Sequence, residues 1–298
     1  MYAYTPPPLC EKLNAILAQV QNLQPLPTSI HQILRALNKP ETTAKELANL
    51  LATDQALTAH TLHAANSAFL GYSSPCSSLI EAVMRLGFNQ LRSVVFTGLA
   101  LNPLSRRLVG YGLGAGALWE HSVATAQYAR KIAQVLHYAE LEEAYIAGLL
   151  HDMGKLFLDQ FVLEDYHQIV QLMKEKQISV WQAEEVMFGI DHARLGGLVA
   201  KKWDLPSKFV EAIQYHHLPS FAWRYKELGA IVNIANSFTP KDSTSLAGLD
   251  GRLPNPIAME ILQLDPYGLD RLWGSKRESK CHSRRNVHPY SPTDRSAG

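Results

Sequence analysis

The chain contains 298 residues, of which 47% are hydrophobic and 18% are charged, so it can bury a large core as a globular protein. No apolar stretch approaches the roughly 20 residues of a membrane span, and no basic start precedes a secretory apolar core, which predicts a soluble, cytoplasmic protein without membrane association. The three cysteines have no paired spacing, which argues against a disulfide framework or a zinc knuckle and predicts reduced thiols.

Helical signals dominate the N-terminal half, and sustained period-two alternation is almost absent from the whole chain, so the fold is predicted to be all-α. Thr43–Glu46 and Ser78–Glu81 have the form of capping boxes, and each is followed by apolar residues at helical spacing. Asp54 is placed to cap a helix that runs toward Asn66. Gly87 is expected to end one helix before the next begins.

The segment Asn102–Ala117 contains a proline and four glycines, and it predicts a hinge or lobe boundary. Helical periodicity resumes with a helix that has a small-residue face and carries His121 at its beginning. The next helix is expected over about residues 140–151. Later helix starts are indicated by local signals at Ser179, Asp191 and Pro206. The last of these helices should reach the adjacent pair His216-His217.

Four regions are predicted along the chain. Residues 15–108 form an N-terminal helical lobe, residues 109–240 form a second helical lobe, and residues 241–273 form a C-terminal extension with short helices. Residues 274–298 carry six Lys or Arg residues against two acids and few apolar residues, so this basic tail is predicted to be disordered. A solvated tail is expected, and an acidic partner such as nucleic acid is the less favoured alternative.

Residues 149–155 read Leu-Leu-His-Asp-Met-Gly-Lys, which brings an adjacent His and Asp to the end of an apolar helix. The His151 imidazole offers a neutral nitrogen, and the Asp152 carboxylate offers charge and can bridge ions, so the pair can serve one metal ion or two. Lys155 places a cation where a phosphate could sit. The alternative is a hydrogen-bonding arrangement at a helix end.

Histidines gather at predicted helix ends in the second half of the chain. In a helical bundle, such ends from separate helices can converge on one cavity and build a metal site. The candidate ligands are His121, His151, Asp152, His192, His216 and His217. For His121 and His192, an ordinary polar contact in a first helical turn is the competing interpretation.

The order of these residues resembles the HD superfamily of metal-dependent phosphohydrolases, in the layout of its HD-GYP branch. The resemblance rests on His121, His151-Asp152, Gly154-Lys155, His192 and His216-His217. The superfamily's last metal ligand is an aspartate within an Ile-Val-x-x-Ala-Asp segment, and here that segment ends in Asn236. The resemblance therefore implies a metal site with one degenerate position, because an amide oxygen brings no charge to a hard cation.

The N-terminal half resembles HDOD domains at their hallmark positions, and the similarity covers about residues 15–240. These positions are Leu26-Pro27, Asp54–Leu57, Ala65–Ala68, and Ile80–Val83 followed by Leu86-Gly87. The resemblance implies a helical bundle of the HD superfamily, found mostly in bacterial signalling and regulatory proteins and generally without hydrolase activity. The Gly-Tyr-Pro stretch that names the HD-GYP enzymes is absent after His217.

The favoured interpretation is a bacterial HDOD regulatory module without catalysis, which engages a signalling protein and retains a pocket for a divalent metal ion (Fe, Mn or Zn) or a small ligand. A single ion is expected rather than a complete binuclear centre, because Asp152 is the only carboxylate among the matched ligands. The alternative is a metal-dependent phosphohydrolase or phosphodiesterase acting on a nucleotide or cyclic dinucleotide, with Asp152 and Lys155 in catalytic roles.

Overall fold

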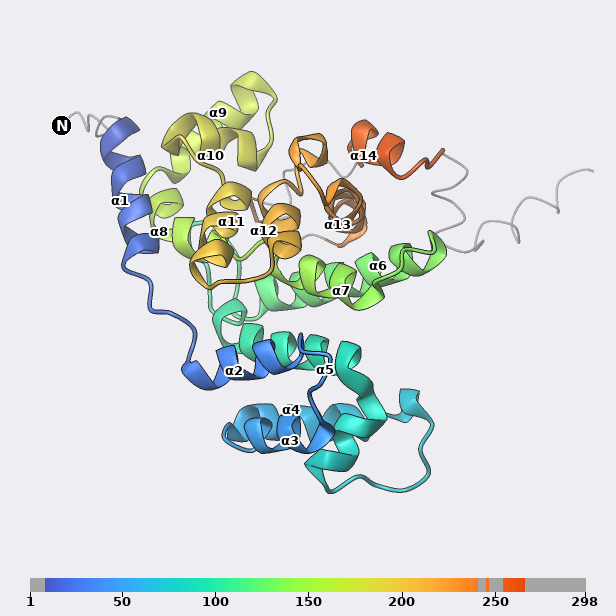
Figure 1. The fold of residues 1–298 in the computed structure, drawn as a ribbon. Coiled ribbons are helices and arrows are strands. Elements are labelled where there is room, and N and C mark those ends of the chain that lie inside the picture. The colour runs from blue at the N-terminus through green and yellow to red at the C-terminus, as the bar shows by residue number, and fades with distance from the viewer. Residues whose placement is uncertain (1–8, 241–244, 247–253, 266–298) are drawn as a thin grey trace, which may run out of the picture. The chain divides into compact units, whose positions relative to one another are not determined.

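The computed structural model describes residues 9–240, 245–246 and 254–265 (Figure 1). Within these ranges the regular elements are helices, and one isolated bridge joins Leu108 to Leu113. The all-α prediction is confirmed. Contacts group Met1–Gln263 into one compact unit, and the two helical lobes expected inside it stay a prediction. The helix expected near residues 267–273 and the basic tail lie outside the described ranges.

The N-terminal part is made of short helices followed by a long one. They are α1 (Leu9–Gln21), α2 (Thr28–Ala36), α3 (Ala44–Leu51), α4 (Gln55–Ala65), the 3-10 turn η1 (Ala68–Leu70) and α5 (Leu79–Leu104). Helices α3 and α4 pack against α5, and α2 packs against α3. Helix α1 stands apart from this group, because it packs against α8, α10 and α11 of the C-terminal part.

Two of the N-terminal caps expected from the sequence are present, with the structure giving one of the two bonds of the capping box expected at Thr43. The Thr43 hydroxyl accepts a hydrogen bond from the Glu46 N–H (3.2 Å) at the start of α3. The Asp54 carboxylate accepts one from the Leu57 N–H (3.0 Å) at the start of α4. Each cap gives a partner to an amide that has none within its own helix.

The capping box expected at Ser78 is wrong in its chemistry. Ser78 does precede the first residue of α5, but its side chain makes no capping hydrogen bond. Glu81 stands at the position from which a capping box reaches back, and its carboxylate pairs instead with Arg85 one turn later. Because Arg85 takes up the Glu81 carboxylate, the capping box does not form. The Ser78–Glu81 pattern therefore predicted where α5 begins but not how its first turn is hydrogen-bonded.

Helix α5 contains a kink and extends further than expected. Gly87 has φ 68° and ψ 167°, a backbone conformation that glycine reaches without a Cβ clash, so the predicted break is present as a kink. The expected hinge begins too early, because α5 continues through Pro103 to Leu104. Pro103 lies in the last turn, where it removes only one hydrogen bond and the Ser105 N–H still bonds the Leu101 carbonyl (3.0 Å).

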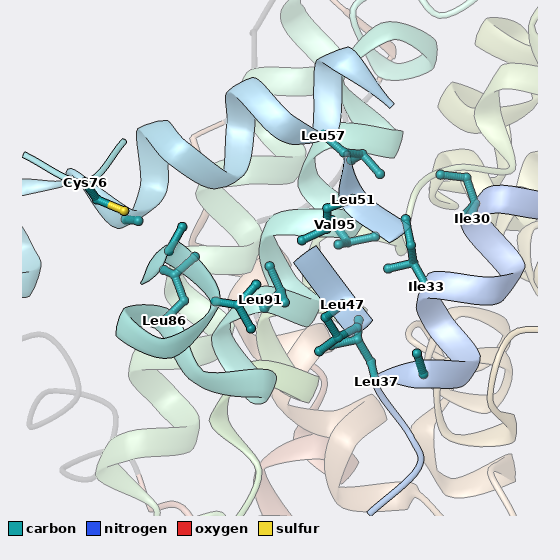
Figure 2. Close-up of a cluster of buried hydrophobic side chains, with 14 residues drawn as sticks. Ile30, Ile33, Leu37, Leu47, Leu51, Leu57, Cys76, Leu86, Leu91 and Val95 are labelled. Atoms are coloured by element: carbon teal, nitrogen blue, oxygen red, sulfur yellow. The ribbon is translucent and has the colours of Figure 1, made fainter. Parts of the chain in front are cut away.

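The helices α2 to α5 share an apolar core (Figure 2). Its buried residues are Ile30, Ile33, Ala36, Leu37, Leu47, Leu51, Leu57, Ala65, Cys76, Ala82, Val83, Leu86, Leu91 and Val95. Leu47, Leu51 and Leu91 expose no surface, and full burial of one such side chain stabilises a fold by about 1.5–3 kcal/mol. Hydrophobic burial therefore holds this part of the molecule together.

The C-terminal part begins after an irregular segment, Ser105–Gly116, and continues as a bundle of short helices. They are α6 (Ala117–Val135), α7 (Leu141–Leu150), α8 (Lys155–Glu164), α9 (Tyr166–Lys176), α10 (Val180–Phe188), α11 (His192–Lys202), α12 (Ser207–Gln214), the 3-10 turn η2 (Pro219–Phe221), α13 (Lys226–Phe238) and α14 (Pro256–Ile261). Helix α6 packs along α7, α13 packs against both, and α11 packs against α12.

The caps expected in the second half are present at α10 and α11. Ser179 and Gln182 form a reciprocal capping box at the start of α10. The Asp191 carboxylate accepts a hydrogen bond from the Arg194 N–H (2.7 Å) at the start of α11. Among the helices described, none has the combination of length and apolar character that crossing a membrane requires.

The helix expected to open at Pro206 is shorter than predicted. Helix α12 ends at Gln214, so His216 and His217 follow it in a turn rather than lying on a helix. The expectation that this helix reaches the pair is therefore wrong. Their ring centroids are 4.0 Å apart, with the ring planes tilted by 45°, because the chain leaves helical geometry at Tyr215, where φ is −117°.

Candidate metal centre

Helix ends from separate parts of the chain meet around one buried carboxylate, that of Asp152, which exposes no surface. The residues that meet there are His121 in the second turn of α6, His151 and Asp152 just after α7, Lys155 at the start of α8, His192 at the start of α11, and His216 and His217 after α12. The structure therefore brings together the His, Asp and Lys residues expected from the sequence. Their role as metal ligands stays a prediction.

Asp152 lies at the centre of this group, which we call the His/Asp cluster. Its Oδ1 atom is 3.2 Å from His192 Nε2 and 3.9 Å from His216 Nε2. Its Oδ2 atom is 3.3 Å from His151 Nε2 and 3.5 Å from His121 Nε2. The two oxygens thus face different histidines, so this carboxylate could serve two neighbouring ion positions.

Two glycines allow the helices to come this close. A Cβ atom on Gly148 would lie 2.9 Å from the Ala126 Cα, where α7 crosses α6. A Cβ atom on Gly154 would lie 1.9 Å from the carbonyl oxygen of His192, which no side chain can tolerate. Gly154 has φ −64°, so it is the close approach of α11, and not the backbone conformation, that requires glycine there.

The outer nitrogens of three histidines are held by acceptors, which decides where the inner nitrogens point. The Nδ1 atoms of His151 and His216 each lie 2.8 Å from a backbone carbonyl, of Gly148 and Ile213 respectively. Because a carbonyl only accepts, Nδ1 carries a proton in both rings, and in the neutral form of each ring Nε2 keeps its lone pair. This arrangement is typical of metal-binding histidines, whose second nitrogen is fixed by an outer partner. The His192 Nδ1 atom is held by the Glu184 carboxylate (2.7 Å).

The ligand atoms form two groups within which all atoms lie inside 4.8 Å of one another: His121, His151 and Asp152 in one, and His192, His216 and His217 in the other. Several of these atoms are buried without a hydrogen-bond partner, namely His151 Nε2, His216 Nε2 and Asp152 Oδ1. Unpartnered buried acceptors are costly, and a cation would satisfy them. A nitrogen-rich set with one carboxylate fits a divalent transition metal better than Mg²⁺ or Ca²⁺.

Charge in the cluster is uneven. Burial alone would raise the pKa of Asp152, but His151 and Lys155 hold it well below its usual range. Burial lowers the pKa of His192, and the nearby Glu184 carboxylate reverses this and raises it to about 9. Burial and the neighbouring histidines lower the pKa of His216. The cluster therefore holds an anion at its centre, and in the far-side group the shifts favour a neutral ring for His216 and a protonated ring for His192.

Two pockets reach the cluster. One, of about 390 Å³, is lined by His121, Asp152 and Lys155 together with Glu120 and Thr239. In it the Lys155 Nζ atom lies 2.7 Å from Asp152 Oδ2, so the cation predicted for a phosphate is bound to the carboxylate.

The second pocket, of about 310 Å³, is lined by His217 and by Arg194, Tyr215 and Phe221. The His217 ring stacks on Trp181, with centroids 5.1 Å apart and planes within 11°. A small molecule could therefore approach either ligand group from its own side.

Asn236 lies on α13, and its Oδ1 atom is buried without a hydrogen-bond partner. None of the contacts around Asp152 given above involves it. Sequence reasoning missed two buried residues: Glu184, which bonds His192, and Tyr111, which bonds Glu184. Glu184 precedes His192 by eight residues across a turn, a spacing without helical meaning, and Tyr111 lies among glycines, so no local pattern marked them.

The comparisons with known proteins identify a family. The HDOD domain family matches residues 23–219. An uncharacterized protein of Treponema pallidum (strain Nichols) is 28% identical over 246 residues, which is 82% of this chain, and the chain spans about half the length (46%) of that relative.

Solved structures share the fold. An HDOD domain protein of unknown function from Geobacter sulfurreducens is 30% identical, with a TM-score of 0.66 over 88% of this chain and 87% of the other. A candidate phosphohydrolase from Shewanella amazonensis SB2B is 23% identical, with a TM-score of 0.65 over 87% and 93%. A candidate signal transduction protein from Marinobacter aquaeolei VT8 is 20% identical, with a TM-score of 0.65 over 89% and 62%. The family match covers well over half of the residues, and the chain belongs to the HDOD domain family.

Proposed function

We propose that the protein is a regulatory HDOD module that binds a divalent metal ion, or a small ligand through that ion, without hydrolysing it. The observation that carries this proposal is the shortage of acidic ligands. Asp152 is the only carboxylate in the two ligand groups, and Asn236 stands where the HD superfamily places its last aspartate. Two divalent ions would bring four positive charges against a single carboxylate.

Lys155 further reduces the negative charge available to a metal ion. Its ammonium group is buried and bound to Asp152 Oδ2 (2.7 Å), so the only anionic ligand already has a cationic partner. The residues that would hold an ion are His121, His151, Asp152, His192, His216 and His217, with Asn236 as the degenerate position. When bound, Fe, Mn or Zn would supply positive charge that attracts an anionic ligand. One ion held through Asp152 fits these charges better than two.

The regulatory part of the proposal is supported by the family and by relatives with the same fold. One of the fold relatives is described as a candidate signal transduction protein. We infer that a separate signalling protein binds the helical surface and that occupation of the pocket changes its affinity.

Metal content and turnover test this proposal together. Protein purified without a histidine tag should contain a single Fe, Mn or Zn ion per chain and should release no phosphate from nucleotides, cyclic dinucleotides or a phosphodiester chromogen. Asp152→Ala should remove the ion. Asp54→Ala is the matched control, because it removes a carboxylate that caps α4. Two tightly bound ions together with turnover would refute the proposal, as would the absence of any bound ion or ligand.

The alternative, a metal-dependent phosphohydrolase acting on a nucleotide or cyclic dinucleotide, has one observation in its favour. The pocket of about 390 Å³ beside His121 and Asp152 offers room for a phosphate next to the Lys155 ammonium group. If this alternative holds, protein loaded with Mn²⁺ or Fe²⁺ should show turnover, and Asp152→Ala and Lys155→Ala should each abolish it.

A further inference from the structure

The segment between α5 and α6 sends one aromatic side chain deep into the C-terminal part. Tyr111 lies within Ser105–Gly116 and exposes no surface. Its hydroxyl donates a hydrogen bond to Glu184 Oε1 (2.8 Å) on α10. Burial, and then the Glu184 carboxylate, raise the pKa of Tyr111 well above its usual value, so the hydroxyl keeps its proton and acts as the donor. The segment is therefore anchored next to the His/Asp cluster.

The backbone around Tyr111 is fixed as well. The Asp159 carboxylate on α8 accepts hydrogen bonds from the N–H groups of Gly110 (2.8 Å) and Tyr111 (3.3 Å). A Cβ atom on Gly110 would lie 2.1 Å from the Asp159 carbonyl oxygen, so only glycine allows this approach. The Lys155 Nζ atom lies 5.8 Å from the centroid of the Tyr111 ring. The tyrosine is thus held from two sides.

Glu184, which Tyr111 holds in place, in turn fixes the orientation of His192. The Oε2 atom of Glu184 accepts hydrogen bonds from the His192 backbone N–H (2.8 Å) and from its Nδ1 atom (2.7 Å). With Nδ1 engaged, the His192 Nε2 atom is directed toward Asp152 Oδ1 (3.2 Å) and His217 Nε2 (3.0 Å). Glu184 exposes no surface, and its three donors leave it only this orientation.

His192 differs in this respect from its neighbours. His151 and His216 are held by backbone carbonyls, which are neutral. His192 is held by a charged side chain, and it belongs to the ligand group that contains three histidines and no carboxylate. A carboxylate behind a ligand histidine makes its other nitrogen a stronger ligand. The negative charge that Asp152 Oδ1 alone brings to that group is therefore reinforced by Glu184 one layer behind it.

We propose that Tyr111 and Glu184 are positioning residues of the metal site, with Glu184 supplying negative charge through His192 to the all-histidine ligand group and Tyr111 holding Glu184 in place. This inference rests on the proposed metal binding. It assigns to the site itself the segment Ser105–Gly116, which lies within the hinge or lobe boundary predicted for Asn102–Ala117.

Metal affinity measured with Zn²⁺ and Co²⁺ on the full chain tests this assignment. Glu184→Gln keeps the shape of the side chain and removes its charge, and we expect it to weaken binding by about 10- to 100-fold. Tyr111→Phe removes one hydrogen bond to Glu184 and should weaken binding by about three- to tenfold.

Each variant has a matched control on an element of the same region. Glu185→Gln alters the next residue of α10, whose carboxylate pairs with Arg194 on the surface. Tyr145→Phe removes a hydroxyl that contacts Thr97 (3.3 Å). Both controls should bind metal as the wild type does.

The visible absorption of bound Co²⁺ separates positioning from simple stability. A positioning role predicts that Glu184→Gln changes the intensity and energy of these bands, whereas a purely structural role would lower the unfolding temperature and leave them unchanged. Wild-type affinity and spectrum in folded Glu184→Gln and Tyr111→Phe would overturn this inference while leaving the proposed function intact. Wild-type protein that binds neither ion would contradict both.

Discussion

The helices α2–α5 and the helices α6–α13 differ in what they bury. Apart from the Arg85 side chain, which pairs with the partly exposed Glu81, the buried polar residues of 28–104 are Thr42, Thr61 and Ser93, and none of these three is charged. The buried Asp, Glu, His and Lys side chains of the described chain lie instead on α1 or from Glu143 onward. An apolar core requires only matched volumes, whereas each buried charge requires a partner in a fixed place. The first part therefore serves as an apolar scaffold, and the second holds the partnered charges on which the proposed metal site depends.

A cavity in the apolar core of α2–α5 should give the largest loss of stability and leave metal binding unchanged. Leu51 exposes no surface and belongs to the core of α2–α5, so Leu51→Ala should lower the free energy of unfolding by about 2–5 kcal/mol. Denaturant unfolding measures this loss. The folded variant should keep the metal affinity of the wild type, and a parallel loss of metal would show that the two regions are not independent.

Adding a methyl group at Gly154, beside the His/Asp cluster, should lower both the stability of the protein and its metal affinity. Gly154→Ala places a Cβ atom 1.9 Å from the His192 carbonyl oxygen, so α8 and α11 must separate, at a cost of about 1–3 kcal/mol or more. Metal affinity should fall with it, as measured by chelator competition. Gly114→Ala is the control, because no heavy atom lies within 4 Å of its Cβ position. Equal behaviour of the two variants would contradict the close approach described here.

Loss of a side-chain hydrogen bond within the scaffold should lower stability by a smaller amount. The Asn66 side chain bonds both the carbonyl (2.8 Å) and the N–H (2.6 Å) of Cys76 and so closes the loop after α4. Asn66→Ala should lower the free energy of unfolding by about 1–2 kcal/mol. Thermal and denaturant unfolding would measure it. A change in metal affinity of folded protein would argue against the scaffold role of this region.

The smallest effect is expected at a helix cap. Thr43→Ala removes the hydroxyl that caps α3 and should cost about 1 kcal/mol. Ser78→Ala is its partner experiment, because Ser78 makes no capping bond and its loss should be nearly silent. Chemical denaturation of both variants checks the pair, and equal losses would mean that Ser78 caps α5 in solution.

Sequence reasoning succeeded where a structure depends on neighbouring residues. Thr43, Asp54, Ser179 and Asp191 act within three residues of themselves, so their patterns were readable. It failed at Ser78, where an ion pair with Arg85 diverted the expected partner.

The candidate site shows the same limit at longer range. The histidines could be matched through a resemblance, because they keep a recognisable order along the chain. Tyr111 and Glu184 are 73 positions apart, and their contact depends on how the segment Ser105–Gly116 docks onto α8 and α10. Likewise, the need for glycine at position 154 comes from the nearby His192 carbonyl oxygen, which lies 38 positions further along the chain and which no local pattern could indicate.

The buried ion pair of Lys155 with Asp152 affects whether the chain can fold before it binds a metal ion. Many small metalloproteins remain unfolded until their ion arrives, because ligand charges repel one another or stay unsatisfied without it. Here the ammonium group already neutralises the central carboxylate (2.7 Å). If the cluster binds the proposed ion, we therefore expect newly made chains to fold before that ion arrives. The amount of folded protein would then not depend on metal supply, and only its occupancy would follow the metal available to the cell.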